Sequence, residues 1–296
     1  MGIIYLFDRY FKKYFMKGTK AVNPSNTGIF DNGISCVRED DVNIWFYTKS
    51  GNTIAFDSGH RDFKNVNLEF EKIKVNPNDV KNVFMTHVDV DHAGGMDKKG
   101  NSVFPNAQVY IGNEEEQYLT GKMYRMKKFR FLKLKVGVSL KNDYKLLSDG
   151  EVVNIGDIKI EAIHIPGHTL GHMCYLIDDS ILITGDCLAI NKNGGYPFWD
   201  FFTQNPELNK KSLQKLKEFQ ITKQEMDNQE KEIKQAIQKA MEEHGIKSFE
   251  NEDVKISYVA PTQRVSVDTA KMKEEGIYDF YTKASEVKAS VRLTYK

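Results

Sequence analysis

Four side chains of a kind that commonly bind metals fall within six consecutive residues of this 296-residue chain: His87, Asp89, Asp91 and His92. An apolar run at 83–85 precedes them, and two glycines at 94–95 follow them. Neutral imidazoles and ionised carboxylates are the ordinary nitrogen and oxygen ligands of divalent transition metals. A short loop after a buried strand can therefore supply much of a metal centre. A solvated polar loop is the alternative, and further ligand-type residues downstream argue against it.

Two more ligand-type residues each follow a glycine that ends an apolar, strand-like run. His168 comes after Pro166-Gly167, and Asp186 comes after Gly185. Glycine lets the backbone turn, so that one side chain can be aimed outward from the end of each strand. Both residues are candidates to complete the metal centre.

Together these segments resemble the metallo-β-lactamase superfamily, over about residues 30–265. That family has His-x-His-x-Asp-His, then a distant Pro-Gly-His, a Gly-Asp after an apolar strand, and a last histidine near the C-terminus. An earlier Asp-x-Gly, here 57–59, also fits. The resemblance implies that Asp57 supports the metal loop, residues 87–92, without binding the metal itself. Two positions depart from the pattern. Asp89 stands where the family has its second histidine, and Gln263 stands near the place of the last one.

The resemblance implies an α/β fold, a four-layer αβ/βα sandwich of two mixed β-sheets face to face with helices outside. Strand-like and helical segments that alternate along the chain agree with such layering. We expect one domain over residues 1–296, with a helical insertion or lid at about 203–248. Apolar spacing predicts a helix over 206–220 and a second, very polar one over 222–244, which could instead form a homodimer contact. A last helical stretch is expected after Ser266.

The resemblance also implies two divalent metal ions, with the ligands His87, Asp89 and His168 for the first ion, Asp91 and His92 for the second, and Asp186 bridging both. Gln263 or water would take the place of the last histidine. Zinc is the first expectation, and the additional carboxylate at position 89 makes iron or manganese the alternatives. Because an amide oxygen is a poorer donor than an imidazole nitrogen, we expect the second ion to bind more weakly.

The function that follows is that of a metal-dependent hydrolase. Water between two divalent cations loses a proton near neutral pH, and this metal-bound hydroxide would attack an ester, thioester, lactone, amide or phosphoester. Asp91 would be the catalytic residue that carries the proton to the leaving group. Two alternatives stay open. One is a diiron redox protein related to the flavodiiron core, which has a carboxylate at the position of Asp89, and the other is a degenerate, metal-poor binding or sensor protein.

The net charge and the cysteine content limit the kinds of partner and the compartment that we expect. The formal net charge is +1, so no global field suggests a nucleic acid or a membrane, and we expect a small-molecule substrate. The basic, aromatic-containing segment 121–135 could hold an anionic substrate or a nucleic acid, but because the whole chain is balanced in charge it is interpreted as a solvated face. Three cysteines form no Cys-x-x-Cys pair and leave one unpaired, which favours the reducing cytoplasm.

Four further features have open interpretations. The aromatic segment 1–20 is expected to dock on the body of the protein as a turn of helix or as an extra strand. The segment 189–202 either overhangs the metals or fills a core. His60 is interpreted as a surface turn residue that could instead face the cleft. His172 either supports the ligands or is a core histidine with a backbone partner.

Overall fold

The computed structural model describes residues 3–15, 24–61, 63, 66–129, 132–191, 194–252, 254–267, 282–287 and 290–295. The chain forms two compact units, Met1–Leu216 and Lys217–Lys296. The single domain with a helical insertion at about 203–248 stays a prediction. No helix within the described ranges is long and apolar enough to cross a membrane.

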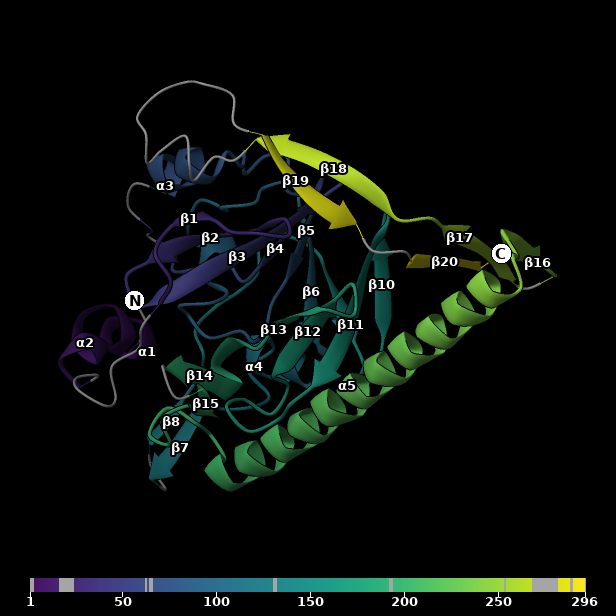
Figure 1. Cartoon of the computed structure of the whole chain (residues 1–296). Coiled ribbons are helices and arrows are strands. Elements are labelled where there is room, and N and C mark those ends of the chain that lie inside the picture. Colours follow the sequence, from purple (N-terminus) through teal and green to yellow (C-terminus); the bar gives the residue numbers. More distant parts are fainter. Residues whose placement is uncertain are drawn as a thin grey trace. The chain divides into compact units, whose positions relative to one another are not determined.

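Two β-sheets form the framework of the first unit (Figure 1). The larger sheet has, in spatial order, β1 (Gly28–Ile29), β2 (Ile34–Glu39), β3 (Val42–Lys49), β4 (Asn52–Phe56), β5 (Asn82–Phe84), β6 (Gln108–Gly112) and β9 (Tyr144–Leu147). Its last four strands run parallel, and the others are antiparallel. The smaller, antiparallel sheet has β10 (Val152–Ile155), β11 (Ile158–His164), β12 (Met173–Ile177) and β13 (Ile181–Ile183).

The alternation of side chains along the strands builds the layers. In β3, Ile44 and Phe46 enter one apolar cluster, which also contains Phe70 of helix α3 (Val66–Ile73). Tyr47 enters a second cluster, whose members come from both sheets, so the two sheets pack face to face. A third cluster joins the outer face of β11 and β12 to Leu216 of helix α5 (Pro206–Glu243). The predicted α/β sandwich of four layers is therefore confirmed.

Helix α5 is continuous, so the prediction of two helices over 206–220 and 222–244 is wrong. Asn205 caps the start, where its Oδ1 accepts a hydrogen bond from the backbone N–H of Leu208 at 3.1 Å. Neither glycine nor proline occurs between residues 207 and 243, and the β-branched pair Ile221-Thr222 weakens a helix only slightly. Gly245, with φ 65°, follows the last turn as a left-handed cap.

The second unit contains short strands besides its part of α5. One sheet has β16 (Ser248–Glu250), β17 (Val254–Val259) and β20 (Ser290–Tyr295), and β18 (Thr262–Val267) pairs with β19 (Thr282–Val287). The helical stretch predicted after Ser266 falls on residues 268–281, which lie outside the described residues, and the segments 282–287 and 290–295 that come later are strands.

Smaller elements complete the first unit. They are α1 (Ile3–Leu6), a π-helical turn (Phe7–Phe11), α2 (Lys12–Phe15), α4 (Glu116–Leu119), the paired strands β7 (Met126–Phe129) and β8 (Leu132–Leu134), and the paired strands β14 (Leu188–Asn191) and β15 (Gly194–Pro197).

The N-terminal helical segment, 3–15, docks on the larger sheet, as one of its two interpretations predicted. Tyr5 is buried in the core cluster of that sheet, and Arg9 pairs with Glu39 at 2.9 Å. His60 lies buried between this segment and the sheet, with Nδ1 2.7 Å from Glu39 Oε2 and Nε2 bonded to Asp8. The interpretation of His60 as a surface turn residue is therefore wrong, because two carboxylates hold it inside.

Docking of this segment should depend on pH. Burial by itself lowers the pKa of His60, but the hydrogen bonds to Asp8 and Glu39 outweigh it and raise the pKa to about 10. An unfolded imidazole titrates near pH ~6.5, so this stabilisation is complete below that pH and is lost as the pH rises toward the folded pKa. Through His60 we expect the free energy of unfolding to fall by ~1.4 kcal/mol per pH unit within that window.

Urea denaturation across the window measures this slope. His60→Gln, which carries no charge at any pH, should show a flatter dependence than the wild type. An equal slope in both proteins would contradict the assignment.

Candidate metal centre

The predicted ligands of the first unit come together at one end of the facing sheets. The loop 87–92 follows β5, and His168 lies in the loop between β11 and β12. Asp186 lies in a short 3₁₀ helix, Gly185–Cys187, after β13. Loops from different sheets meet here because the sheets share one apolar core.

Two carboxylates each lie between imidazoles. Asp89 Oδ2 is 3.4 Å from His87 Nε2 and 3.4 Å from His168 Nε2. Asp186 Oδ1 is 3.4 Å from His92 Nε2, and its Oδ2 is 3.7 Å from His168 Nε2. The predicted ligands form two groups of donors, one of His87, Asp89 and His168 and one of His87, His92 and Asp186. Within each group all donor atoms lie within 4.8 Å of one another.

This spacing fits a divalent metal ion. Donors at roughly 2.0–2.1 Å from a tetrahedral zinc ion lie about 3.3–3.4 Å from one another. In addition, His87 Nε2 and His92 Nε2 are buried and have no hydrogen-bond partner within the part of the chain that the structure describes. An unpaired buried nitrogen is costly, and a bound cation would satisfy both atoms.

Asp57 supports the metal loop from the end of β4, as the family pattern implies. Its backbone takes the left-handed conformation, with φ 62°. One carboxylate oxygen accepts the backbone N–H of Thr86 at 2.8 Å, and the other lies 2.8 Å from His92 Nδ1. This contact fixes the ring and leaves its Nε2 to face Asp186.

Glu115 is a buried carboxylate that joins the two ligand-bearing loops. It accepts the backbone N–H of Val88 at 2.8 Å and that of Gly171 at 3.1 Å, and it also accepts the hydroxyl of Thr169. Its position sets the distance between the loop of His87 and the loop of His168.

Arg125 lies against Asp89. Its Nε donates to both oxygens of Asp89, at 2.7 and 2.9 Å, and its Nη2 lies 3.1 Å from His168 Nε2. The residue is 5% exposed, so the interpretation of segment 121–135 as a solvated face is wrong for Arg125. Burial raises the pKa of Asp89, but the guanidinium and the neighbouring imidazoles outweigh it and hold the pKa well below its usual range.

Lys12 reaches the centre from the N-terminal segment. Its Nζ lies 2.7 Å from Asp91 Oδ2, 2.8 Å from Asp8 Oδ1 and 2.9 Å from Asp41 Oδ2. Burial lowers the pKa of Lys12, but the three carboxylates outweigh it and raise the pKa well above its usual value. The ammonium therefore stays charged beside a predicted metal ligand.

A cavity of about 270 Å³ opens beside this centre. Its polar lining includes Lys12, Arg125, His168 and Asp186, and its apolar lining includes Phe7, Phe198 and Phe202. The Phe198 ring meets the His168 ring edge-on, with 5.3 Å between centroids. The segment 189–202 therefore borders the centre, which agrees with the first of its two interpretations.

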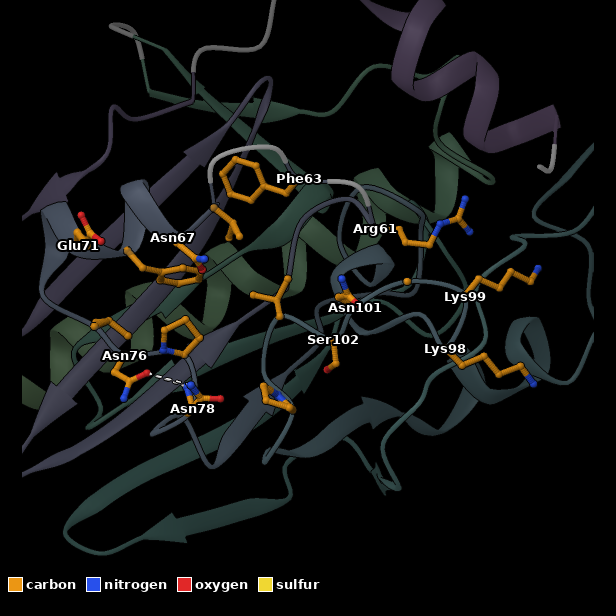
Figure 2. Close-up of a pocket in the computed structure, with 17 residues that line it drawn as sticks. Arg61, Phe63, Asn67, Glu71, Asn76, Asn78, Lys98, Lys99, Asn101 and Ser102 are labelled. Atoms are coloured by element: carbon orange, nitrogen blue, oxygen red, sulfur yellow. Dashed lines mark hydrogen bonds between the residues drawn. The ribbon is translucent and has the colours of Figure 1, made fainter.

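A larger cavity, of about 1120 Å³, lies beside α3 and the loop 98–105 (Figure 2). Arg61, Lys98 and Lys99 lie on one side of it, and Asn76 and Asn78 lie on the other. None of the predicted ligands lines it, so the ligand chemistry, rather than cavity size, locates the candidate site.

Three further residues were discussed as possible ligands or supporting residues in the sequence analysis. Gln263 lies in β18 of the second unit, opposite Glu286, and because its side chain is outside the described part, its role as a ligand stays a prediction. His172 is buried, with its ring 5.2 Å from that of His87, and neither ring nitrogen has a hydrogen-bond partner among the described residues. His60 faces Glu39 and Asp8 with its two nitrogens, so neither nitrogen is free for a metal.

Sequence reasoning missed Lys12 and Arg125. For Arg125 a signal existed, because a buried carboxylate in place of a histidine requires a cation nearby, and the segment 121–135 is rich in them. For Lys12 we find no such signal, because 79 residues separate it from Asp91.

Comparison with known proteins gives a consistent result. Residues 37–223 match the sequence model of the metallo-beta-lactamase superfamily. A hydroxyacylglutathione hydrolase of Maricaulis maris is 31% identical over 110 residues, which are 37% of this chain and 34% of the relative. One from Dictyostelium discoideum is 30% identical over 135 residues, 43% of this chain and 39% of the relative.

Two further proteins, one curated relative and one solved structure, are similar to this chain. PksB of Bacillus subtilis, described as a probable polyketide biosynthesis zinc-dependent hydrolase, is 34% identical over 108 residues, 36% of this chain and 39% of the relative. The chain thus spans between 34% and 39% of the length of these relatives. Among solved structures, BJP-1, a subclass B3 metallo-beta-lactamase of Bradyrhizobium japonicum, is 20% identical with a TM-score of 0.47, covering 67% of this chain and 75% of that one.

The donor groups predict that the purified protein contains at least one transition-metal ion per chain. His87 belongs to both groups. The double variant His87→Ala/His168→Ala should therefore lose the metal. Elemental analysis after gel filtration measures this, and His164→Ala/His244→Ala, which removes two histidines outside the centre, is the matched control. Unchanged metal content in the first variant would disprove the assignment.

Proposed function

Because the chain belongs to the metallo-beta-lactamase superfamily, we propose that it is a metal-dependent hydrolase of a small ester or thioester with an apolar acyl group. The cavity beside the candidate metal centre is the observation that carries the proposal. Asp186 and His168 line one part of it, and phenylalanine side chains line another. A reacting carbonyl at the ligands would place its acyl group against those rings.

The residues that would hold the metal are those of the two donor groups, with His87 common to both. When bound, a divalent ion supplies Lewis acidity to a water molecule and to the scissile carbonyl. We propose zinc, because the ligands are imidazoles and carboxylates and because the relative PksB is described as zinc-dependent.

The protein's own side chains would position the substrate and move protons. Phe198 and Phe202 exclude water from the acyl side of the cavity. Asp91 remains our candidate for carrying the proton to the leaving group. Burial raises its pKa, but the Lys12 ammonium outweighs this effect and holds the pKa below its usual range, so Asp91 is ionised at neutral pH.

Thioesters come first among the possible substrates. Two relatives are described as hydroxyacylglutathione hydrolases, and a human relative, 27% identical over 115 residues, as acyl-coenzyme A thioesterase MBLAC2. The match to the human protein covers 34% of this chain and 39% of the relative. Lactones, amides and phosphoesters are substrates of the same kind of metal-dependent hydrolysis, so a substrate panel should contain all of them. The free cysteines Cys36, Cys174 and Cys187 favour a cytoplasmic site of action.

A metal-poor binding protein is the second candidate, and one observation favours it. Arg125 and Lys12 neutralise Asp89 and Asp91, both predicted ligands. Absence of bound metal in a protein purified without chelator would support this candidate against the hydrolase. For the diiron alternative we find no favouring contact, because Asp89, its characteristic carboxylate, already accepts hydrogen bonds from Arg125 on both oxygens.

The cavity predicts a preference for longer acyl groups that depends on Phe198. Phe198→Ala should lower the ratio of kcat/KM for a hexanoyl over an acetyl thioester roughly tenfold, which corresponds to ~1.4 kcal/mol of lost apolar contact. Because the ratio is measured within one variant, a general loss of activity cancels.

Phe249→Ala is the control, since this side chain is 52% exposed in the second unit. A ratio that is equal in Phe198→Ala and the wild type would reject the assigned acyl site. Absence of hydrolysis across the whole panel, in protein with full metal content, would reject the hydrolase itself.

A further inference from the structure

We infer that this chain binds one divalent ion, held by His87, His92 and Asp186, and that Arg125 and Lys12 take the place of a second ion. The inference rests on the proposed metal-dependent function and specifies its centre. It is drawn from which ligand atoms already have a cationic partner and which do not.

Arg125 withdraws two donors from metal binding. Its Nε contacts both oxygens of Asp89, at 2.7 and 2.9 Å, and its Nη2 lies 3.1 Å from His168 Nε2. The same Nη2 donates to the carbonyl of Phe202 at 2.8 Å, which fixes the guanidinium in place. A metal ion on Asp89 and His168 would therefore have to displace a buried arginine.

Lys12 withdraws Asp91 in the same way. An ammonium group has three N–H donors, and the Nζ of Lys12 has three carboxylate partners, Asp91, Asp8 and Asp41, at 2.7 to 2.9 Å. The side chain is 9% exposed. A metal ion on Asp91 would lie close to this ammonium, or would expel it and leave Asp8 and Asp41 without their cation.

The remaining donors form a group of their own. His87 Nε2 and His92 Nε2 are buried and lack a hydrogen-bond partner among the described residues, and Asp186 Oδ1 is 3.4 Å from His92 Nε2. These three ligand atoms lie within 4.8 Å of one another. Two imidazoles and one carboxylate are a common ligand set for a single catalytic zinc ion.

The charges agree with one ion. Of the three carboxylates in the predicted ligand set, Asp89 is paired with Arg125, and Asp91 shares the Lys12 ammonium with Asp8 and Asp41. Asp186 is left without a lysine or arginine partner among the described residues. The two side-chain cations together carry the charge of one divalent ion. A second metal ion would add two positive charges beside two buried cations, at a distance where repulsion in a low-dielectric site is strong.

The test is the number and location of bound zinc ions at a free zinc concentration fixed by a chelator buffer. We expect one ion per chain in the wild type. His92→Ala should abolish binding of this ion, because an inner ligand is lost, whereas His168→Ala should keep one ion with a Kd raised by at most about 10- to 100-fold, as for a group outside the ligand set. The double variant Lys12→Met/Arg125→Met should bind more than one ion.

The matched control is Arg9→Met/Arg61→Met, which removes two cations that pair with Glu39 and Asp97 outside the centre, and it should keep one ion. Two ions in the wild type, loss of zinc in His168→Ala, or one ion in the Lys12/Arg125 variant with a native circular dichroism spectrum would each overturn the inference. The single-histidine variants do not depend on that double variant folding. No zinc in the wild type would instead reject the proposed function.

Discussion

A single buried carboxylate sets the spacing on which the candidate centre depends. Glu115 accepts backbone N–H groups of Val88 and Gly171, and these neighbours of His87 and His168 belong to loops of different sheets. Sheets that meet through apolar side chains have no strong directional contact, because hydrophobic burial is non-directional. Hydrogen bonds to one buried group are directional and costly to lose, so they fix the two loops relative to each other. Asp57 does the same within the larger sheet by holding both Thr86 and the ring of His92.

A second constraint is electrostatic, because several carboxylates at one buried site require positive charges nearby. The segments that supply the counter-charges are the ones that look peripheral in the sequence. The N-terminal helical segment brings Lys12, and the basic segment 121–135 brings Arg125. Removing one partner of a buried ion pair is costly, about 3–5 kcal/mol, because it leaves an uncompensated charge. The N-terminal segment is thus held to the centre by charge as well as by the burial of Tyr5.

Local pattern predicted the α/β layering and placed the candidate ligands after the strands that carry them. The glycines before His168 and Asp186 act over a few residues, and the structure places these two residues after β11 and β13. Long-range pairing was beyond that reasoning. His60 was interpreted as a surface turn residue because its partners Asp8 and Glu39 are distant in the sequence. Asp8, for example, is 52 residues from His60. The continuity of α5 was missed for a different reason, since two amphipathic stretches were separated at a place with no helix-breaking residue.

The two departures from the family pattern can be understood as one electrostatic arrangement. A neutral imidazole at position 89 would leave the Arg125 guanidinium buried without its carboxylate, so the aspartate and the arginine depend on each other. Lys12 has the equivalent relation to Asp91, which we predict as a ligand of the second ion. That ion would also lack the family's last histidine, because Gln263 stands near its place. In the one-ion arrangement that we infer, each departure would reduce the ligands available to one ion, and the carboxylate that this ion would have used contacts a side-chain cation. A substitution that restores a histidine ligand without also removing the matching cation would therefore add a donor to a site where the positive charge is already supplied.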